Sequence, residues 1–492
     1  MQRRYLTYAA AIASVLGLTY CSSGSVDRQP GVAVAVPGVS SAVTYSFDLG
    51  VVDPVTHKYY VTDRTNKAID VFDPATGVVT QFKNSGYGGC NSGGTAGGST
   101  NTPYVPMAGC VNITTTGIIF PNSAPGSSGI PVFATGTLVT NNDLDGPDGL
   151  DIVGSTLYVG DVNHLWVVNR TTGATVGSVA IPNTGLKQGF RSDEGCFDPV
   201  NHLYAIALTG DPNTPLYTIL DTTAAETGAA LPTILGFVLM NGPDNAPSGG
   251  LEACAFDSAG GFMYLNNDGS TANPNGEMDA IPIADLIAMR TTPLGGSKMV
   301  VFQGSAAGPF VQFNSAATAA GICALGSGGS CGTVAPKVFP LPALCDPTGL
   351  ALGPGTDVGA MCRPGTLGHS LDFVILNRTT GATVQVVTGA GGGDQITYDA
   401  TSNKWYLGDS RQTANSLSCG AGTAVTCPLT PQVVVVDGTS HAIVARIASG
   451  NNSHSIAVDG PRQTVYSPFT NSSASGGGAA FPNGGLNLFS TQ

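Results

Sequence analysis

Charged residues are scarce in this sequence, and basic residues are the scarcest of them. Asp, Glu, Lys and Arg make up only 10% of the 492 residues, and 19 Lys and Arg stand against 32 Asp and Glu, which gives a net charge of −13. Coiled coils and long helical bundles need many more charged residues. An acidic chain with few cations repels the phosphates of nucleic acids, so we expect no nucleic-acid partner. Intrinsic disorder is disfavoured as well, because 42% of the residues are hydrophobic.

Long apolar segments are also lacking, since a bilayer span takes about 20 apolar residues. The apolar run near the start, roughly Tyr8–Leu18, is too short for that, and no later segment is a better candidate. Arg3 and Arg4 precede this run, and a basic start followed by a short apolar stretch is typical of a secretory signal. Residues 1–24 are therefore predicted to be a signal peptide, and residues 25–42 a linker.

The processing of this N-terminus has two alternatives. Leu18-Thr19-Tyr20-Cys21 resembles the cleavage site of bacterial lipoproteins, although Tyr20 departs from the small residue of that pattern. Ordinary cleavage, for instance after Gly24 or Ala35, would release the protein instead. We expect a secreted, periplasmic or cell-surface protein, which contacts a membrane only if a lipid anchor is attached at Cys21.

The cysteines favour disulfides. Of 11 Cys, ten remain when Cys21 is set aside, and an even number in an exported chain indicates disulfides rather than metal thiolates. Sequence alone does not give the connectivity. Pairing of neighbours along the chain predicts Cys90–Cys110, Cys196–Cys254, Cys323–Cys331, Cys345–Cys362 and Cys419–Cys427.

Gly and Pro, by contrast, are abundant, and many of the Gly fall in a repeated motif. The string NRTTGATV occurs at 169–176 and again at 377–384, each time after an apolar run. In this motif a strand ends in Asn, a Thr-Gly turn follows and a second strand begins, which is the signature of a β-hairpin. A second hairpin, in which a strand ends in Asp and a Tyr-containing strand follows, recurs upstream, for instance at 52–62 and 197–207.

The two hairpins together give four antiparallel strands per repeat of roughly 40–60 residues, which is the pattern of a β-propeller blade. We therefore predict an all-β fold with seven blades in one domain, residues 43–492; six or eight blades are the alternatives. Disulfide-tied insertions are expected near 83–140 and 304–344, and closure of the ring by a strand near Val43–Phe47. The predicted blades begin near Tyr45, Gly146, Arg191, Gly249, Asp346, Gly393 and Ser453.

The repeat resembles a known family. YYVTDRTNKAIDVFDPATGVV (59–79) is similar to the YVTN-type β-propeller repeat, which is related to the NHL repeat, and QVVVVDGTSHAIVARI (432–447) is similar to its second half. The resemblance implies a seven-bladed propeller of the kind common in exported or surface proteins. It does not imply one activity, because similar propellers include binding platforms, lactone hydrolases and lyases.

One position of the repeat carries candidate chemistry. The first strand of each blade lines the central channel, and the residue expected at its channel end is acidic or His in nearly every blade. These residues are Asp48, Asp148, Asp193 with Glu194, Glu252, Asp346, Asp394 and His454. Carboxylates held close together raise one another's pKa or bind a cation, and Ca²⁺ takes six to eight oxygen ligands. The alternative is that these side chains only cap loops through backbone N–H groups.

Two main functions follow. The first is a binding platform for a small molecule, a glycan or a protein, because loops on a rigid scaffold are common binding sites. The second is a hydrolase or lactonase that depends on Ca²⁺ or another divalent cation at the channel mouth, with Glu252 or Glu194 as ligand or base and His454 as proton carrier. A structural protein of the cell envelope is a third alternative. The predicted metal ligands are Asp148, Glu194, Glu252, Asp394 and His454.

Overall fold

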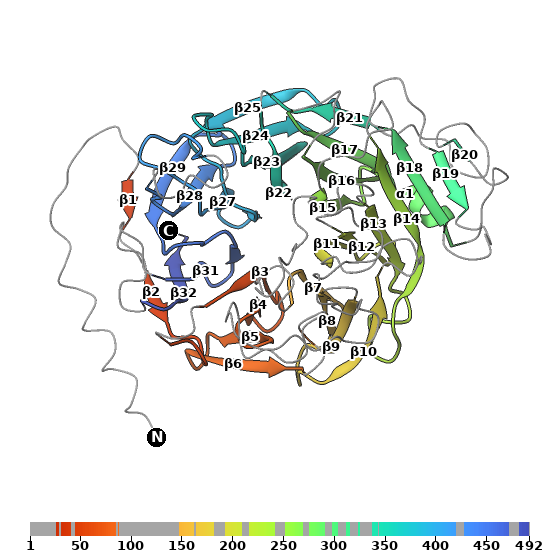
Figure 1. The fold of residues 1–492 in the computed structure, drawn as a ribbon, viewed down its shortest axis with the longest axis horizontal. Helices are drawn as coiled ribbons and strands as arrows, with labels where there is room; N and C mark the ends of the chain where they lie inside the picture. Colours follow the sequence, from red (N-terminus) through yellow and green to blue (C-terminus); the bar gives the residue numbers. More distant parts are fainter. Residues whose placement is uncertain are drawn as a thin grey trace, which may run out of the picture.

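Seven β-sheets are arranged around a central axis in the computed structural model of the chain (Figure 1). The prediction of a seven-bladed β-propeller is confirmed, and among the described residues the fold contains one short helix. The structure describes residues 26–28, 31–40, 45–84, 87, 147–161, 164–181, 192–208, 216–241, 251–268, 275–290, 298–303, 311–314, 323–324, 337–342, 344–419, 428–471 and 482–491.

Each blade contains four antiparallel strands, counted from the channel outward. Blade 1 consists of β3 (Phe47–Val52), β4 (Tyr59–Asp63), β5 (Ala68–Asp73) and β6 (Val78–Lys83). Blade 2 consists of β7 (Leu150–Val153), β8 (Thr156–Asp161), β9 (His164–Asn169) and β10 (Thr175–Ala180). Blade 3 consists of β11 (Ser192–Asp198), β12 (Leu203–Leu208), β13 (Leu216–Asp221) and β14 (Thr233–Asn241). Blade 4 consists of β15 (Leu251–Asp257), β16 (Phe262–Asn267), β17 (Glu277–Pro282) and β21 (Lys337–Pro340). Blade 5 consists of β22 (Pro347–Leu352), β23 (Asp357–Cys362), β24 (Asp372–Asn377) and β25 (Thr383–Thr388). Blade 6 consists of β26 (Ile396–Asp399), β27 (Lys404–Asp409), β28 (Gln432–Asp437) and β29 (Ile443–Ala448). Blade 7 consists of β30 (Ala457–Asp459), β31 (Thr464–Phe469), β32 (Gly485–Ser490) and β2 (Val32–Val34).

Both predicted hairpins are present, and local side chains explain their turns. In the first hairpin of blade 1, Asp53 Oδ1 accepts a hydrogen bond from the Val55 N–H at 2.8 Å, so the strand-ending Asp caps its own turn. In the repeated NRTTGATV motif, Asn169 Oδ1 accepts from the Thr171 and Thr172 N–H groups, and Gly173 has φ +72°. That backbone conformation favours Gly, which explains the Thr-Gly turn.

The strand that closes the ring is not the one predicted. The segment near Val43–Phe47 contributes the start of β3, the innermost strand of blade 1, whereas β2 pairs with β32 as the outer strand of blade 7. The open edge of blade 7 lies at the rim, so only a segment upstream of blade 1 reaches it. The predicted linker 25–42 therefore contains a strand of the propeller. It also contains β1 (Val26–Arg28), which pairs in parallel with β29.

The predicted insertion near 304–344 also contains regular structure. After β17 the chain forms α1 (Ile283–Ala288) and then β18 (Lys298–Gln303), which pairs in parallel with β14 of the preceding blade. Next come β19 (Val311–Asn314), β20 (Cys323–Ala324) and finally β21, the outer strand of blade 4. Figure 1 shows β18, β19 and β20 on the outer rim. They cover the edge of the long apolar strand β14, and such an edge is an aggregation hazard when left open. Of the other predicted insertion, 83–140, residues 88–140 lie outside the described residues.

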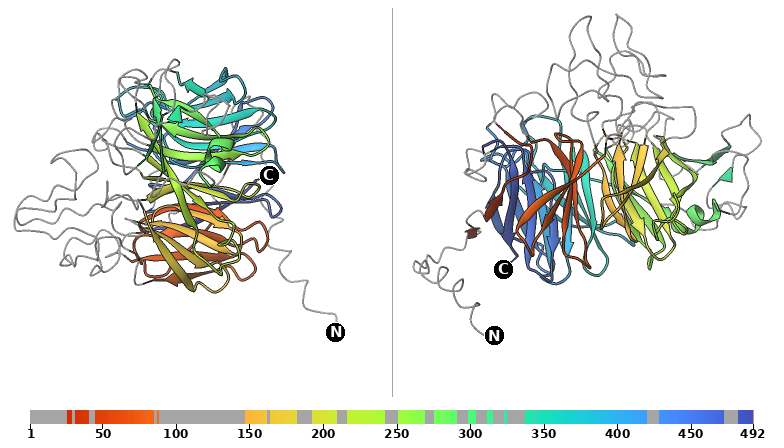
Figure 2. Two further views of the ribbon diagram at one scale, coloured as in Figure 1. Left: turned by 90° about the vertical axis from the view of Figure 1, so that its right-hand side faces the viewer. Right: turned by 90° about the horizontal axis from the view of Figure 1, so that it is seen from below.

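The core lies between neighbouring blades, whose strands run between the two faces of the disc (Figure 2). Tyr59 of blade 1 stacks on Tyr466 of blade 7, with ring centroids 4.9 Å apart, and both side chains are fully buried. Phe373 of blade 5 packs edge-on against Trp405 of blade 6 at 5.2 Å. These contacts fix each blade against the next and hold the innermost strands in a ring.

Two of the predicted disulfides are confirmed. Cys196–Cys254 links β11 to β15, and Cys345–Cys362 links the residue before Asp346 to the end of β23. Cys419 is also disulfide-bonded. Its predicted partner lies outside the described residues, as do both cysteines of the pair 90–110 and the second cysteine of the pair 323–331.

Candidate functional site at the channel mouth

The innermost strands place all the predicted channel-end residues at one end of the channel. Each residue lies at the start of its strand or within three residues before it, and these strands are β3, β7, β11, β15, β22, β26 and β30. Neighbouring starts are in contact: the Leu49 N–H donates to the Asp148 carbonyl, and the Asp394 N–H donates to the His454 carbonyl. We call this set of side chains, together with three arginines described next, the channel mouth.

The sequence analysis missed the three arginines. Arg64 follows β4 directly, Arg363 follows β23 directly, and Arg411 is the second residue after β27. The second strand of a blade runs antiparallel to the first, so its end lies beside the channel end of the first strand. A residue just after the Tyr strand is therefore a channel-mouth position, and the repeat alignment would have revealed these arginines.

Blades 1, 2 and 7 form the first part of the mouth, in which a buried arginine neutralises two carboxylates. Arg64 Nη2 lies 2.5 Å from Asp48 Oδ2, and Arg64 Nε donates to Asp148 Oδ1 at 2.6 Å. His454 Nε2 lies 3.2 Å from Asp48 Oδ1, while its Nδ1 faces the Asn452 carbonyl oxygen at 2.7 Å. Asp48, Arg64, Asp148 and His454 are at most 5% exposed. We call these four residues the closed half.

Blades 4, 5 and 6 form the second part, which is more accessible. Arg363 Nη1 donates to Asp394 Oδ1 at 2.9 Å, and Arg363 Nη2 lies 3.6 Å from Glu252 Oε1. Asp346, Arg363 and Asp394 are half-buried, and Arg411 is exposed. Glu252, Asp346, Arg363, Asp394 and Arg411 are called the open half.

Two aspartates of the open half, Asp394 and Asp346, have pKa values shifted in opposite directions. Burial would raise the pKa of Asp394, but Arg363, His454 and Arg411 together hold it below its ordinary value. For Asp346, burial prevails over Arg363 and Arg411, and its pKa is raised. The mouth therefore contains an ionised Asp394 next to a more proton-retentive Asp346.

Glu194 of blade 3 differs from the other acids. Burial, followed by the negative charges of Glu252, Asp193, Asp394 and Asp48, raises its pKa well above the ordinary value. These four carboxylates come from blades 4, 3, 6 and 1, so the Glu194 side chain points into the channel. It is 5% exposed and makes no hydrogen bond or ion pair within the described part of the chain.

Arg411 of blade 6 also lacks a direct partner. Its backbone N–H donates to the Gly392 carbonyl at 3.0 Å, but among the described residues its guanidinium makes no hydrogen bond or ion pair. Desolvation and the nearby Arg363 lower its pKa to about 10, against the opposing effect of the acids. Arg411 is therefore exposed to solvent and lies close to Arg363 and to the acids Asp394, Glu252 and Asp346.

Both described disulfides fix residues of this site. Cys196 and Cys254 each lie two residues after Glu194 and Glu252, so their bond holds these two like-charged side chains close to each other. Cys345 and Cys362 each directly precede Asp346 and Arg363, and the Arg363 N–H donates to the carbonyls of Cys345 and Asp346. One covalent link therefore holds two acids of the mouth near each other, and the other holds an acid next to an arginine.

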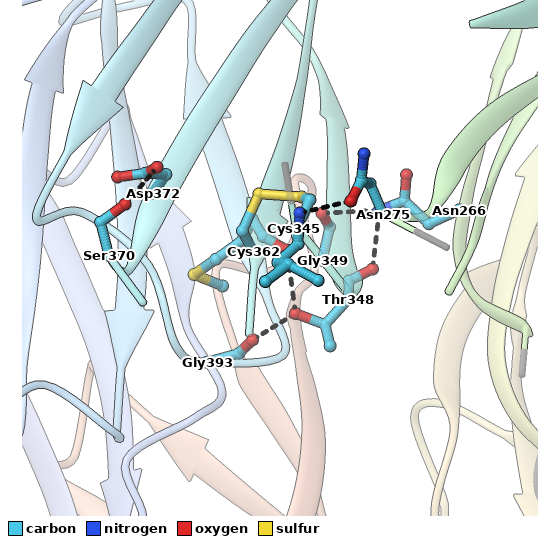
Figure 3. Close-up of a disulfide and its surroundings, with 11 residues drawn as sticks. Asn266, Asn275, Cys345, Thr348, Gly349, Cys362, Ser370, Asp372 and Gly393 are labelled. Atoms are coloured by element: carbon cyan, nitrogen blue, oxygen red, sulfur yellow. Dashed lines mark hydrogen bonds between the residues drawn. A yellow bond between two sulfur atoms is a disulfide. The ribbon is translucent and has the colours of Figure 1, made fainter. Parts of the chain in front are cut away.

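The surroundings of the second disulfide extend this support to the next blade (Figure 3). The Cys345 N–H donates to the Asn275 carbonyl at 3.0 Å, and Asn275 Oδ1 accepts from the Leu344 N–H at 2.8 Å. Thr348 Oγ1 donates to the carbonyl of Gly393, the residue before Asp394. This network links the loop before β22 to the loop that carries Asp394.

The predicted metal ligands are brought together only in part. Asp148 is paired with Arg64, Glu252 and Asp394 with Arg363, and His454 with Asp48. In the part of the chain that the structure describes, no group of three or more His, Cys, Asp and Glu side chains has an arrangement able to hold a metal ion. The arginines already supply the positive charge that a cation would bring. The divalent cation stays a prediction, and these ion pairs weigh against it.

Comparisons with known proteins place the chain in no named family. No family model and no curated protein matches the sequence. Solved structures similar to it include a chain of a mitotic checkpoint complex (TM-score 0.48, 10% identity, 97% of this chain and 100% of that chain) and one of hydrazine synthase from Kuenenia stuttgartiensis (0.49, 11%, 96% and 99%). The computationally designed Ika8 protein is also similar (0.41, 9%, 95% and 100%). Similarity at this level carries no information about the ligand or the activity of this protein.

Proposed function

We propose that this protein is an exported binding platform whose channel mouth holds a small polar ligand. Glu194 and Arg411 support the proposal, because among the described residues neither side chain makes a hydrogen bond or ion pair, while Arg64 and Arg363 pair with Asp48, Asp148, Glu252 and Asp394. An unmade hydrogen bond at a buried group such as Glu194 costs about 1–3 kcal/mol, and a bound ligand recovers that cost. The Cys196–Cys254 disulfide lies two residues after Glu194 and holds that strand in place beforehand, which lowers the entropy cost of binding.

A ligand screen with a matched control tests this proposal. We expect some small polar compounds, among sugars, organic acids, amines and amino acids, to raise the melting temperature of the protein. The change Arg411→Gln should abolish that rise. Arg462→Gln should not, because Arg462 is an exposed arginine in the turn between β30 and β31, at the other end of the strands. If no compound stabilises the protein, or if Arg411→Gln leaves every shift intact, the channel mouth is not the binding site.

Export is part of the proposal. The disulfides require an oxidising compartment to form and persist, and residues 1–24 have the pattern of a signal peptide. No helix within the described ranges has the length and apolar character needed to cross a membrane. The mass of the protein recovered from its native source gives the cleavage site. A mass increased by a diacylglycerol on Cys21 identifies the lipid-anchored form, and an uncleaved N-terminus contradicts export by this route.

A hydrolase is the second candidate, and the Glu194–Glu252 pair is the observation that favours it. A carboxyl group with a raised pKa beside a carboxyl group that faces an arginine is an arrangement used in general acid–base catalysis. The predicted pair of Glu252 and His454 is less suited, because Glu252 bonds to Arg363 and His454 bonds to Asp48. Lactone hydrolysis should then fall at least about a hundredfold in Glu252→Gln. Metal content, and the melting temperature measured with and without chelator, show whether such a hydrolase depends on a divalent cation.

A further inference from the structure

Glu194 and Arg411, whose side chains make no hydrogen bond or ion pair with any residue that the structure describes, lie across the channel from each other. Glu194 belongs to blade 3 and Arg411 to blade 6, so two blades separate them on one side of the ring and three on the other. Both side chains nevertheless experience the charges of Glu252 and Asp394. They therefore belong to one site, with a cationic group on one wall and a buried acid on the opposite wall.

We propose that the channel mouth binds a zwitterionic ligand, such as an amino acid or a short peptide with free termini. The ligand carboxylate pairs with Arg411, and its ammonium group lies against Glu194. This inference rests on the proposed binding function and assigns the class of its ligand. A guanidinium offers paired N–H donors that match the two oxygens of a carboxylate, and a carboxylate accepts hydrogen bonds from an ammonium group.

The surrounding charges disfavour ligands with a single charge. A simple anion at Arg411 would also approach Asp346, Asp394 and Glu252, which all act on that arginine. A simple cation would benefit from these acids but would leave Arg411 without a partner. A ligand with both charges places its negative end at the exposed guanidinium and its positive end among the acids on the far wall.

Binding of an ammonium group beside Glu194 should be coupled to the release of a proton. Glu194 is faced by Glu252 on β15, Asp193 on β11, Asp394 before β26 and Asp48 on β3, and Tyr217 on β13 lies near it. Burial and these neighbours raise the pKa of Glu194 well above its ordinary value, so its carboxyl group retains a proton to higher pH than an ordinary glutamate does. An ammonium group beside it lowers that pKa, and the proton is released to solvent when the ligand binds.

A length series of peptides tests the inference by isothermal titration calorimetry. Glycine, diglycine, triglycine and tetraglycine carry the same two charges at increasing separation, so affinity should peak at one length. The best peptide should bind at least about tenfold more tightly than its N-acetylated form, its C-terminal amide or glucose, since a charge-assisted contact is worth at least that factor. Titrations in two buffers of different ionisation enthalpy should show proton release near pH 7.5.

Two pairs of variants separate binding from folding. Arg411→Gln and Glu194→Gln should each weaken the best peptide about tenfold or more, and Glu194→Gln should also abolish proton release. Arg462→Gln and Glu226→Gln carry the same changes at the other end of the strands and should preserve both affinity and proton release. Glu226 lies in the loop between β13 and β14, where it pairs with His202 at 2.8 Å. Circular dichroism of each variant confirms that the fold is retained.

The outcomes distinguish this inference from the proposed function on which it rests. If glucose or a singly charged peptide binds as tightly as the zwitterion, and Arg411→Gln weakens it, the mouth is a binding site but the inference about its ligand is wrong. If the zwitterions bind and neither Arg411→Gln nor Glu194→Gln changes their affinity, the inference is also wrong. If no peptide of the series binds, the inference is overturned, and the melting-temperature screen decides the broader proposal separately.

Discussion

The closed and open halves of the channel mouth use the same positions of the repeat but are stabilised differently. In the closed half, Arg64 is buried and bonded to two carboxylates. In the open half, Arg363 is half-buried and pairs with two carboxylates, those of Glu252 and Asp394. The Arg411 side chain has no direct partner among the described residues. The Cys345–Cys362 bond belongs to the open half, whereas ion pairs hold the closed half. An arginine that follows the Tyr strand therefore has a structural role in one half and is available for a ligand in the other.

The largest effect is expected from removing the arginine of the closed half. Arg64→Met leaves Asp48 and Asp148 buried without their cation, and breaking a buried ion pair costs about 3–5 kcal/mol of unfolding free energy. Urea denaturation measures this loss. Arg64→Met combined with Asp48→Asn and Asp148→Asn should recover most of it, because no uncompensated buried charge remains. A loss below about 1 kcal/mol for Arg64→Met would show that the closed half is not held by its ion pairs.

Removal of a disulfide is expected to act on the other parts of the mouth. The Cys196–Cys254 bond spans 58 residues, and its removal by Cys196→Ala with Cys254→Ala should cost about 4 kcal/mol, against about 3 kcal/mol for the 17-residue Cys345–Cys362 link. Hydrogen exchange should accelerate around residues 344–363 in the Cys345→Ala, Cys362→Ala protein and remain unchanged around 46–64. Equal acceleration in both segments would contradict a division of the mouth into two independently held halves.

Glu194, which lies between the closed half and the open half, should make the stability of the protein depend on pH. The folded pKa of Glu194 lies above its unfolded value, so the folded protein binds the extra proton between the two values, and stability decreases as pH rises through that window. Glu194→Gln removes this cost, which is about 1.4 kcal/mol for each tenfold difference in proton affinity. The variant should therefore match the wild type near pH 4 and become more stable above it. Glu226→Gln serves as control, and a gain that is the same at every pH would contradict the assignment.

The smallest effect on stability is expected for Arg411→Gln in the open half. An exposed side chain without a direct partner contributes within about 0.5 kcal/mol, so urea denaturation should barely change. The contrast with Arg64→Met is the sharpest test of the comparison, because the two residues occupy nearly equivalent positions in blades 1 and 6. A loss of more than about 2 kcal/mol in Arg411→Gln would assign it a structural role.

The hairpins of the blades were predictable from sequence because their causes are local. Asp53 and Asn169 cap turns two and three residues away, and Gly173 provides the positive φ of its turn. The repeated position of Asp48, Glu194 and Glu252 was predictable as well, since the first strand of every blade has the same orientation. Two of the five predicted disulfides are confirmed. Cys196 and Cys254 occupy the same position in adjacent repeats, and Cys345 and Cys362 lie only 17 residues apart in one blade.

Other features depend on contacts that no local pattern specifies. The strand β2 completes blade 7 by pairing with residues more than 450 positions away, and β18 pairs with the outer edge of blade 3 although it follows a strand of blade 4. Short apolar segments of this kind have no turn or repeat that marks their partner. The charges of the mouth show the same limit, because the pairing of Arg64 with Asp148 joins two blades.

The sequence by itself determined that this chain is a seven-bladed propeller with a recurrent acidic position at one end of the channel. Turn residues and alternating strands act over a few residues, and repetition then multiplies one local preference into a ring. Only the tertiary structure decided which acids are neutralised and which are not. The closure of the ring brings arginines from three blades against carboxylates from five, and burial at that point sets the charge of each group. Within the described part of the chain, Glu194 and Arg411 remain without direct side-chain partners because of this arrangement in space, and for that reason the proposed ligand chemistry depends on the fold rather than on any one motif.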